Sequence, residues 1–436
     1  MAHSLASLLW VIRLLVVVLG LAVVNFVVRG EQASVNQLLS IPRSIGAIVT
    51  TSSTPVAVET TPLGRAQLRR ELQRLFAHHA TLVVRFMRAT VSEDPGFVDA
   101  ANAAVARHTQ DLDATLRRTL DPEDATLLAN EWAAQTQALF AYATALRDGD
   151  DAAREAAREQ LHSQVAQHAV QIVEATGGRV DENVAITALQ MQVDLLQFQI
   201  DAYARADHDQ AYELQREAYA QLAPFAETLA AGATAHRRDT VDAPAEELTA
   251  QMSRLLGAHA ELSIDALRAG VSGSDEFAAA TAAVQSNGQD LSSALEALLG
   301  TRPSRKIDAL WATQTDLLVR YAVAVAEHDP ATRREVRDRL MSVAVKIGRT
   351  LQRTTDGAVH ASAVASALRS HQMLLLDQLE VYAVADYATA HDISYVAHGQ
   401  INDLAHSLAT SFVDVAQTHA PSGGAATGGG GTATNR

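Results

Sequence analysis

Cysteine is absent from all 436 residues of the chain. This absence excludes disulfides, thiolate metal sites, iron–sulfur clusters and cysteine nucleophiles together. Aromatic residues make up only 5%, and proline and glycine are scarce between residues 65 and 235, where leucine, alanine, glutamine, glutamate and arginine are abundant. Such a composition is typical of packed helices that approach closely through alanine.

Positive charge and catalytic motifs are also in short supply. The formal net charge is −15, and a general nucleic-acid binder would need a basic surface, so we expect no nucleic-acid partner. The chain has no His-Glu-x-x-His, no Gly-x-Ser-x-Gly and no phosphate-binding glycine loop before a helix. The sequence therefore predicts a protein that is not an enzyme and needs no cofactor.

The N-terminus contains a long apolar segment, Leu8–Val28, that is interrupted only by Arg13, Gly20 and Asn25. As a signal anchor it would cross the bilayer, with Arg13 reaching the cytoplasmic face. As a signal peptide it would be cleaved near Val28-Arg29-Gly30, and the protein would be secreted. We favour the anchor over residues 1–30, which places the chain at the cell membrane with its bulk outside the cytoplasm.

Two segments of biased composition flank the remainder. Residues 31–64 include runs of serine, threonine and proline, which cannot bury enough apolar surface to fold and are typical of a stalk. Residues 419–436 are rich in glycine, alanine and threonine and predict a flexible tail.

Between these segments the chain repeats itself. The sequence around His79 returns around His259, and that around Trp132 returns around Trp311. The sequence around Tyr203 returns in the same way around Tyr382, and the separation along the chain is nearly the same for all three matches. A match of constant period indicates repeated structural units, so we predict a first repeat over residues 65–235 and a second over 245–418.

Each repeat carries apolar residues at helical spacing, as in Leu68, Leu72 and Leu75, and short turn signals such as Asp148-Gly149-Asp150. The spacing predicts about six helices per repeat, and short connections force antiparallel neighbours. We therefore predict an all-α protein with two tandem antiparallel helical bundles and an N-terminal membrane helix. The alternative is one closed double ring of twelve helices.

Polar residues recur in the middle of these predicted helices. One interpretation is a metal site, with copper or zinc held between helices by inward histidines. The candidate ligands are His79, His108, His259 and His371. The other interpretation is a buried polar layer that fixes helix register, and its members would be Gln135, Gln192, Gln221, Asn287, Gln314 and Gln400. Because glutamine is a poor metal ligand and no glutamate stands at Glu-x-x-His spacing from these four histidines, we favour the polar layer.

Other aromatic and histidine positions give weaker signals. Trp132 and Trp311 are either large core residues or the wall of an apolar ligand cavity. His391 and His398 share one helical face, but a site common to both repeats cannot use them, since the first repeat has tyrosine there. The adjacent His78 and His79 point about 100° apart on a helix, so they do not predict one ion site.

Several short motifs in both repeats follow one order. They are His78-His79, His108, Trp132-Ala133-Ala134-Gln135, Gln192-Val193 and Tyr219-Ala220-Gln221-Leu222 in the first, and Ala258-His259, Asn287, Trp311-Ala312-Thr313-Gln314, His371-Gln372 and His398-Gly399-Gln400-Ile401 in the second. This order resembles a loosely defined group of bacterial exported helical proteins that are often labelled copper amine oxidase-like. The resemblance implies inward histidines that bind metal, yet glutamine stands at positions 135, 192, 221, 314 and 400. No Asn-Tyr dipeptide occurs, so a topaquinone oxidase is not predicted.

These observations predict an exported, membrane-tethered helical protein that binds or scaffolds without catalysis, with an envelope protein as a candidate partner. One alternative is an extracytoplasmic metal-binding protein with ions held by inward histidines. The other is a sensor ectodomain that acts through a separate partner.

Overall fold

The computed structural model describes residues 62–92, 94–235 and 243–418. The predicted membrane segment (1–30), nearly all of the predicted stalk (31–64) and the predicted tail (419–436) lie outside these residues. Among the helices that are described, none combines the length and the apolar character that crossing a membrane requires.

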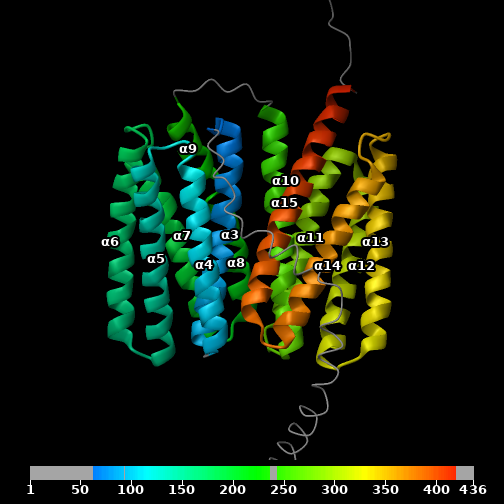
Figure 1. The fold of residues 1–436 in the computed structure, drawn as a ribbon, viewed down its shortest axis with the longest axis horizontal. Helices are drawn as coiled ribbons and strands as arrows, with labels where there is room; N and C mark the ends of the chain where they lie inside the picture. Colours follow the sequence, from blue (N-terminus) through cyan, green and yellow to red (C-terminus); the bar gives the residue numbers. More distant parts are fainter. Residues whose placement is uncertain (1–61, 93, 236–242, 419–436) are drawn as a thin grey trace, which may run out of the picture. The chain divides into compact units, whose positions relative to one another are not determined.

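The described residues form thirteen helices and no strands, which confirms the predicted all-α class (Figure 1). In the first repeat they are α3 (Arg65–Val91), α4 (Pro95–Leu116), α5 (Pro122–Asp148), α6 (Asp151–Ala175), α7 (Glu182–Ala204), α8 (His208–Gln221) and α9 (Ala223–Thr234). In the second repeat they are α10 (Ala243–Ser272), α11 (Phe277–Leu299), α12 (Thr301–Ala326), α13 (Pro330–Thr354), α14 (Ala361–Ala383) and α15 (Tyr387–Thr418).

Local sequence explains where most of these helices begin. Aspartate caps several N-termini by accepting a hydrogen bond from a backbone N–H of the first turn, as Asp94, Asp150 and Asp181 do for α4, α6 and α7. Proline occupies the first turn of α4, α5 and α13, where its missing N–H costs nothing. Helix α5 ends at Gly149, which adopts the left-handed conformation that glycine tolerates best.

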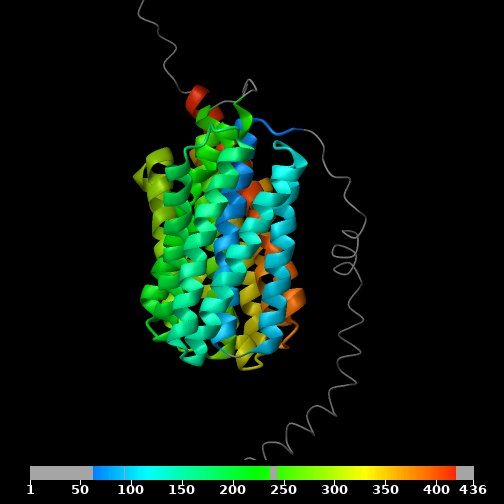
Figure 2. The same ribbon diagram turned by 90° about the vertical axis from the view of Figure 1, so that its left-hand side faces the viewer.

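The two largest apolar clusters are divided in the same way as the sequence repeat. One hydrophobic cluster runs from Leu63 to Ala233 and draws on helices α3 to α9. A second cluster runs from Met252 to Phe412 and draws on helices α10 to α15. Within the compact unit that contains both repeats, α6 and α13 lie at opposite ends, and the helices run side by side along roughly parallel axes (Figures 1 and 2).

The two repeats meet through α3 and α10, with α4 beside α15 and α8 beside α11. Helix α3 is buried without a break from residue 75 to residue 90, and α10 from residue 259 to residue 270. A helix that is enclosed on all sides normally carries apolar residues all round. These two helices instead bury charged residues, among them Arg85, Glu261 and Asp265, so the interface between the repeats is not a purely apolar contact.

Candidate functional site

The second repeat contains a chain of buried hydrogen bonds around His259. Trp311 donates from Nε1 to His259 Nδ1 over 3.2 Å, and Gln314 Nε2 lies 3.2 Å from His259 Nε2. Gln372 then donates from Nε2 to Gln314 Oε1 over 2.8 Å. Burial lowers the pKa of His259 to about 3, so the imidazole is neutral and both of its nitrogens face protein groups.

The first repeat arranges the matching residues differently. Trp132 stacks on Phe76 with ring centroids 4.7 Å apart and meets His79 edge-on. Gln135 Nε2 lies 3.1 Å from Nδ1 of His168, a residue that the sequence did not single out. Burial lowers the pKa of His79 and of His168 to about 3. The polar interior of each repeat is therefore neutral.

The other residues of the predicted polar layer are buried or half-buried. Asn287 donates to the carbonyl of Leu255 over 3.1 Å. Gln221 donates to the carbonyl of Ala188 over 3.0 Å, and Gln400 donates to that of Ala367 over 2.8 Å. The two glutamine donors occupy equivalent positions in the two repeats, as do the two alanine acceptors, so both repeats make the same contact. Gln192 is buried and makes no side-chain hydrogen bond to the described residues.

Of the four histidines proposed as metal ligands, His79 and His108 lie close together in the first repeat, with ring centroids 5.5 Å apart, and His259 and His371 are both buried in the second repeat. Across residues 62–92, 94–235 and 243–418, the histidine and acidic groups that converge as metal ligands are His78, Glu261 and His398. Because neighbouring helical side chains diverge, His79 faces Thr136 within its own repeat, whereas its neighbour His78 faces the second repeat. Sequence reasoning set aside both His78 and His398.

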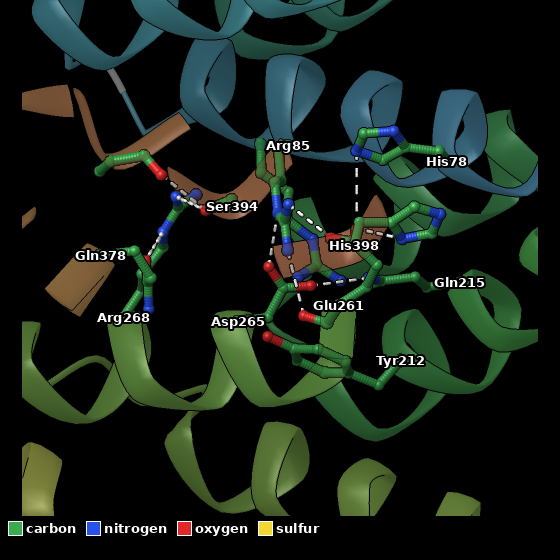
Figure 3. A network of polar contacts seen from close by, with 12 residues as sticks. His78, Arg85, Tyr212, Gln215, Glu261, Asp265, Arg268, Gln378, Ser394 and His398 are labelled. Carbon is green, nitrogen blue, oxygen red and sulfur yellow. Dashed lines mark hydrogen bonds and ion pairs between the residues drawn. The ribbon is translucent and has the colours of Figure 1, made fainter. Parts of the chain in front are cut away.

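The three groups lie on three helices, α3, α10 and α15 (Figure 3). His398 Nδ1 lies 2.7 Å from Glu261 Oε1, and His78 Nε2 lies 3.5 Å from the same oxygen. The rings of His78 and His398 are stacked, with centroids 4.3 Å apart. Each of the three side chains is 1% exposed, so the cluster is fully enclosed between the repeats.

Arg85 holds the carboxylate of Glu261 from the other side (Figure 3). Its NH1 lies 2.7 Å from Glu261 Oε2, and its Nε donates to Asp265 Oδ1 over 2.7 Å. Gln215 of α8 donates to the second oxygen of Asp265, also over 2.7 Å. The nearby Arg268 instead directs its guanidinium to Gln378 and Ser394.

The charges of this network determine the protonation of its members. Burial by itself would raise the pKa of Glu261, but Arg85 and His398 hold that pKa below its usual value. Burial, together with the charges of His398, His108 and the nearby arginines, lowers the pKa of His78 well below its usual value. Glu261 is therefore a carboxylate and His78 a neutral imidazole at neutral pH, which are the forms that bind metal ions.

A cavity of about 640 Å³ opens between the repeats, beside the cluster. Its lining includes Arg74 and Arg254, which occupy equivalent positions in the two repeats. Tyr219 and Asn402 also line it, and the side chains of both lie close to Gly257 on α10. A Cβ atom added to Gly257 would overlap the Tyr219 hydroxyl and lie 3.3 Å from His398 Cε1. The cavity and the cluster are thus separated by one layer of side chains.

The apolar cavity beside Trp311 is small for a ligand that a tryptophan wall would enclose. Trp311 borders an apolar cavity of about 20 Å³, together with residues such as Leu256 and Phe412. Such a space holds at most about one water molecule. Ligand cavities usually measure about 300–1,000 Å³, so the inter-repeat cavity is a better candidate for a ligand.

Comparison with known proteins finds no matching family model, no matching curated protein and no matching solved structure.

The cluster was missed because its residues stand where the repeats differ. At the positions equivalent to His78, Glu261 and His398, the other repeat has Ala258, Thr81 and Tyr219, respectively. A search for positions that both repeats share passes over all three. The signal that could have revealed them is the charge on α3 and α10, since Arg85 and Glu261 interrupt otherwise apolar helical stretches.

Proposed function

We propose that the protein is a non-catalytic binding protein that holds a small anionic molecule in the cavity between its two repeats. The observation that carries this proposal is the cavity itself, which is built from both repeats and lined by arginines in a chain with a net charge of −15.

The arginines of the cavity suit an anion. Arg69, Arg70, Arg74 and Arg254 line it, against the carboxylates of Glu227 and Glu247. Arg69 is engaged by both of these glutamates, each over 3.0 Å. Arg74 donates from Nε to Glu71 over 3.1 Å, a contact that does not use its two terminal nitrogens. A planar guanidinium with free N–H groups recognises carboxylate or phosphate through paired hydrogen bonds.

The proposal includes the arrangement of the repeats as two copies of one bundle. Two separate apolar cores and the nearly constant separation of the matching motifs support it. Arg74 and Arg254 would then face the cavity from related positions, and a ligand there would touch both repeats at once. Binding would stabilise the contact between the repeats because the ligand is held by both of them.

We also propose that this body is exported and tethered to the cell membrane by Leu8–Val28, with the cavity outside the cytoplasm. The apolar run and the following stretch rich in serine, threonine and proline support this location. A tethered binding protein would present its ligand to an envelope protein partner.

Thermal unfolding of the purified full chain, followed with inorganic phosphate and with mono- and dicarboxylates, tests the ligand class. We expect at least one anion to raise the Tm in a saturable manner. The double variant Arg74→Gln/Arg254→Gln should weaken that anion's apparent affinity by about tenfold or more, as expected for lost charge-assisted hydrogen bonds.

The matched control is Arg320→Gln, because Arg320 pairs with Glu335 on an exposed surface between α12 and α13. This variant should bind the anion as the wild type does. If no anion shifts the Tm, or if both variants respond like the wild type, the proposed ligand class is wrong.

A further inference from the structure

We propose that His78, Glu261 and His398 form a binding site for one divalent transition-metal ion, zinc in the first instance, between the two repeats. This site is distinct from the anion cavity and from the four histidines that the sequence pattern suggested.

The donor set has the right chemistry for zinc. Two imidazoles and one carboxylate, contributed by three helices, are a set that proteins use to hold zinc while leaving a coordination position open. All three groups are 1% exposed, so they are shielded from competing solvent. Sites between the helices of a bundle are commonly built from inward side chains in this manner.

The distances are close to those that one ion requires. The ligand atoms of the three residues all lie within 4.8 Å of one another, and two of the separations are 2.7 and 3.5 Å. Zinc lies about 2.0–2.2 Å from nitrogen and oxygen ligands, so two ligands of one ion are separated by at most about 4.2 Å. Because an imidazole nitrogen binds a metal ion in the plane of its ring, at least one of the two stacked rings, which lie 9° from parallel, has to turn out of the stack to reach the same ion.

The polar atoms of the cluster lack well-formed hydrogen bonds. Neither ring nitrogen of His78 or of His398 makes a hydrogen bond to the described residues, although His398 Nδ1 approaches Glu261 Oε1 to 2.7 Å. Buried polar groups are nearly always paired, and an unpaired one calls for an explanation such as an ion. An ion held by one nitrogen of each ring and by Oε1 would give each ring a polar partner.

The surrounding charges permit a cation. Arg85 takes Oε2 of Glu261 and is shared with Asp265, so these three groups carry one net negative charge. Oε1 remains directed at the histidines. Arg268 donates to the neutral Gln378 and Ser394, and among residues 62–92, 94–235 and 243–418 it forms no ion pair. A divalent ion would therefore meet Oε1 of Glu261, which Arg85 holds in place through Oε2 without contacting Oε1 itself.

The cavity supplies a route for the ion. Tyr219 and Asn402 line it, and Asn402 donates to the backbone carbonyl of His398 over 2.7 Å. The absence of a side chain at Gly257 lets Tyr219 and His398 approach α10 closely. Movement of the Tyr219 side chain would expose His398 to solvent in the cavity, so an ion need not cross either apolar core.

The test measures metal bound to the full-length protein after removal of metal with a chelator, addition of Zn²⁺ and dialysis. We expect about one zinc ion per chain and a Tm raised by several degrees. His398→Gln should weaken zinc binding by about 100-fold, since even loss of a group that only supports a ligand costs about 10–100-fold. Co²⁺ should give the visible absorption of a low-coordinate nitrogen and oxygen site.

The matched control is His168→Gln, because His168 is equally buried but pairs with Gln135 inside the first repeat. It should retain one zinc ion per chain. If His398→Gln does not fold, zinc binding by His78→Gln and the Co²⁺ spectrum of the wild type test the same site.

A wild type that retains no zinc would overturn this proposal. It would also fail if His78→Gln and His398→Gln bind zinc like the wild type, or if His259→Gln is the variant that loses the ion. The Arg74→Gln/Arg254→Gln variant should keep its zinc, so failure of the anion proposal and failure of the metal proposal can be told apart.

Discussion

The interior of each repeat and the interface between the repeats bury polar groups in opposite ways. The interiors use neutral groups, as in the hydrogen bond from Trp311 to Nδ1 of His259 and the contact between Gln314 and Nε2 of the same ring. The interface uses charges, with Arg85 enclosed between Glu261 and Asp265. Neutral polar pairs cost little to bury when they are satisfied, whereas buried charges require partners of opposite sign. The interface is therefore the more demanding of the two regions.

The pairing of Arg85 with Asp265 shows why the repeats have diverged there. These two residues occupy equivalent positions of the repeats, one on α3 and the other on α10. When two related units face each other across a two-fold axis, positions at the axis meet their own counterparts. Identical charged residues would repel one another at that point. Arginine in one repeat and aspartate in the other turn this repulsion into an ion pair.

The largest expected effect breaks the interface. Arg85→Met leaves Glu261 and Asp265 as buried carboxylates without their cation, and this should lower the free energy of unfolding by about 3–5 kcal/mol. Urea denaturation of the full chain, followed by circular dichroism, measures the loss. Adding Glu261→Gln and Asp265→Leu to the same chain should restore a large part of it, because the orphaned charges are then removed. A triple variant no more stable than Arg85→Met would contradict this account.

A second effect sharpens the description of the interiors as neutral. Burial lowers the pKa of His79, His168 and His259 from 6.5 to about 3. Between these values the unfolded chain binds protons that the folded chain does not, so stability must fall as the pH decreases below about 6.5. Each such histidine contributes a loss of about 1.4 kcal/mol per pH unit, or about 2 kcal/mol at pH 5.

Urea midpoints at pH 7 and pH 5 measure this loss. His168→Gln should reduce the loss of stability between pH 7 and pH 5 by the contribution of one histidine, about 2 kcal/mol. His162→Gln is the control, because His162 is exposed, and it should leave the difference unchanged. An unaltered difference in His168→Gln would show that this histidine is protonated inside the folded chain.

The smallest effect concerns close approach at the interface. Gly257→Ala would press its Cβ atom against the Tyr219 hydroxyl and should cost about 1 kcal/mol, the lower end for overpacking, since that side chain can tilt toward the cavity. Gly399→Ala is the control, because its added Cβ would meet no described atom within 4 Å outside its own stretch of helix. It should stabilise α15 by about 0.5–1 kcal/mol. Equal thermal shifts in the two variants would rule out a tight contact at Gly257.

Much of the fold could be predicted from the sequence because its causes are local. Helical spacing of leucines, and aspartate or proline at helix starts, act within one or two turns. The predicted break at Asp148-Gly149-Asp150 coincides with the end of α5 and the start of α6. The burial of Gln135 and Gln314 follows from the same spacing, since they share a helical face with Trp132 and Trp311.

The candidate site could not be predicted in this way. His78, Glu261 and His398 are far apart in the chain, and none of them has the same residue type at the equivalent position of the other repeat. The sequence pattern instead indicated the recurring histidines His79 and His259 as candidate ligands, and each of these faces the interior of its own repeat. Spacing along a helix says which residues share a face. It does not say which other helix that face will meet.

The sequence by itself determined that the described part of the chain is helical, where several of its helices begin and end, and that residues 65–235 are echoed by residues 245–418. The tertiary structure decided that α3 and α10 pack against each other and that α15 completes their contact. The physical reason is that helix formation depends on hydrogen bonds and side chains within a few residues, whereas the meeting of His78, Glu261 and His398 depends on how whole helices pack. That packing alone placed charges of opposite sign together at the centre of the interface.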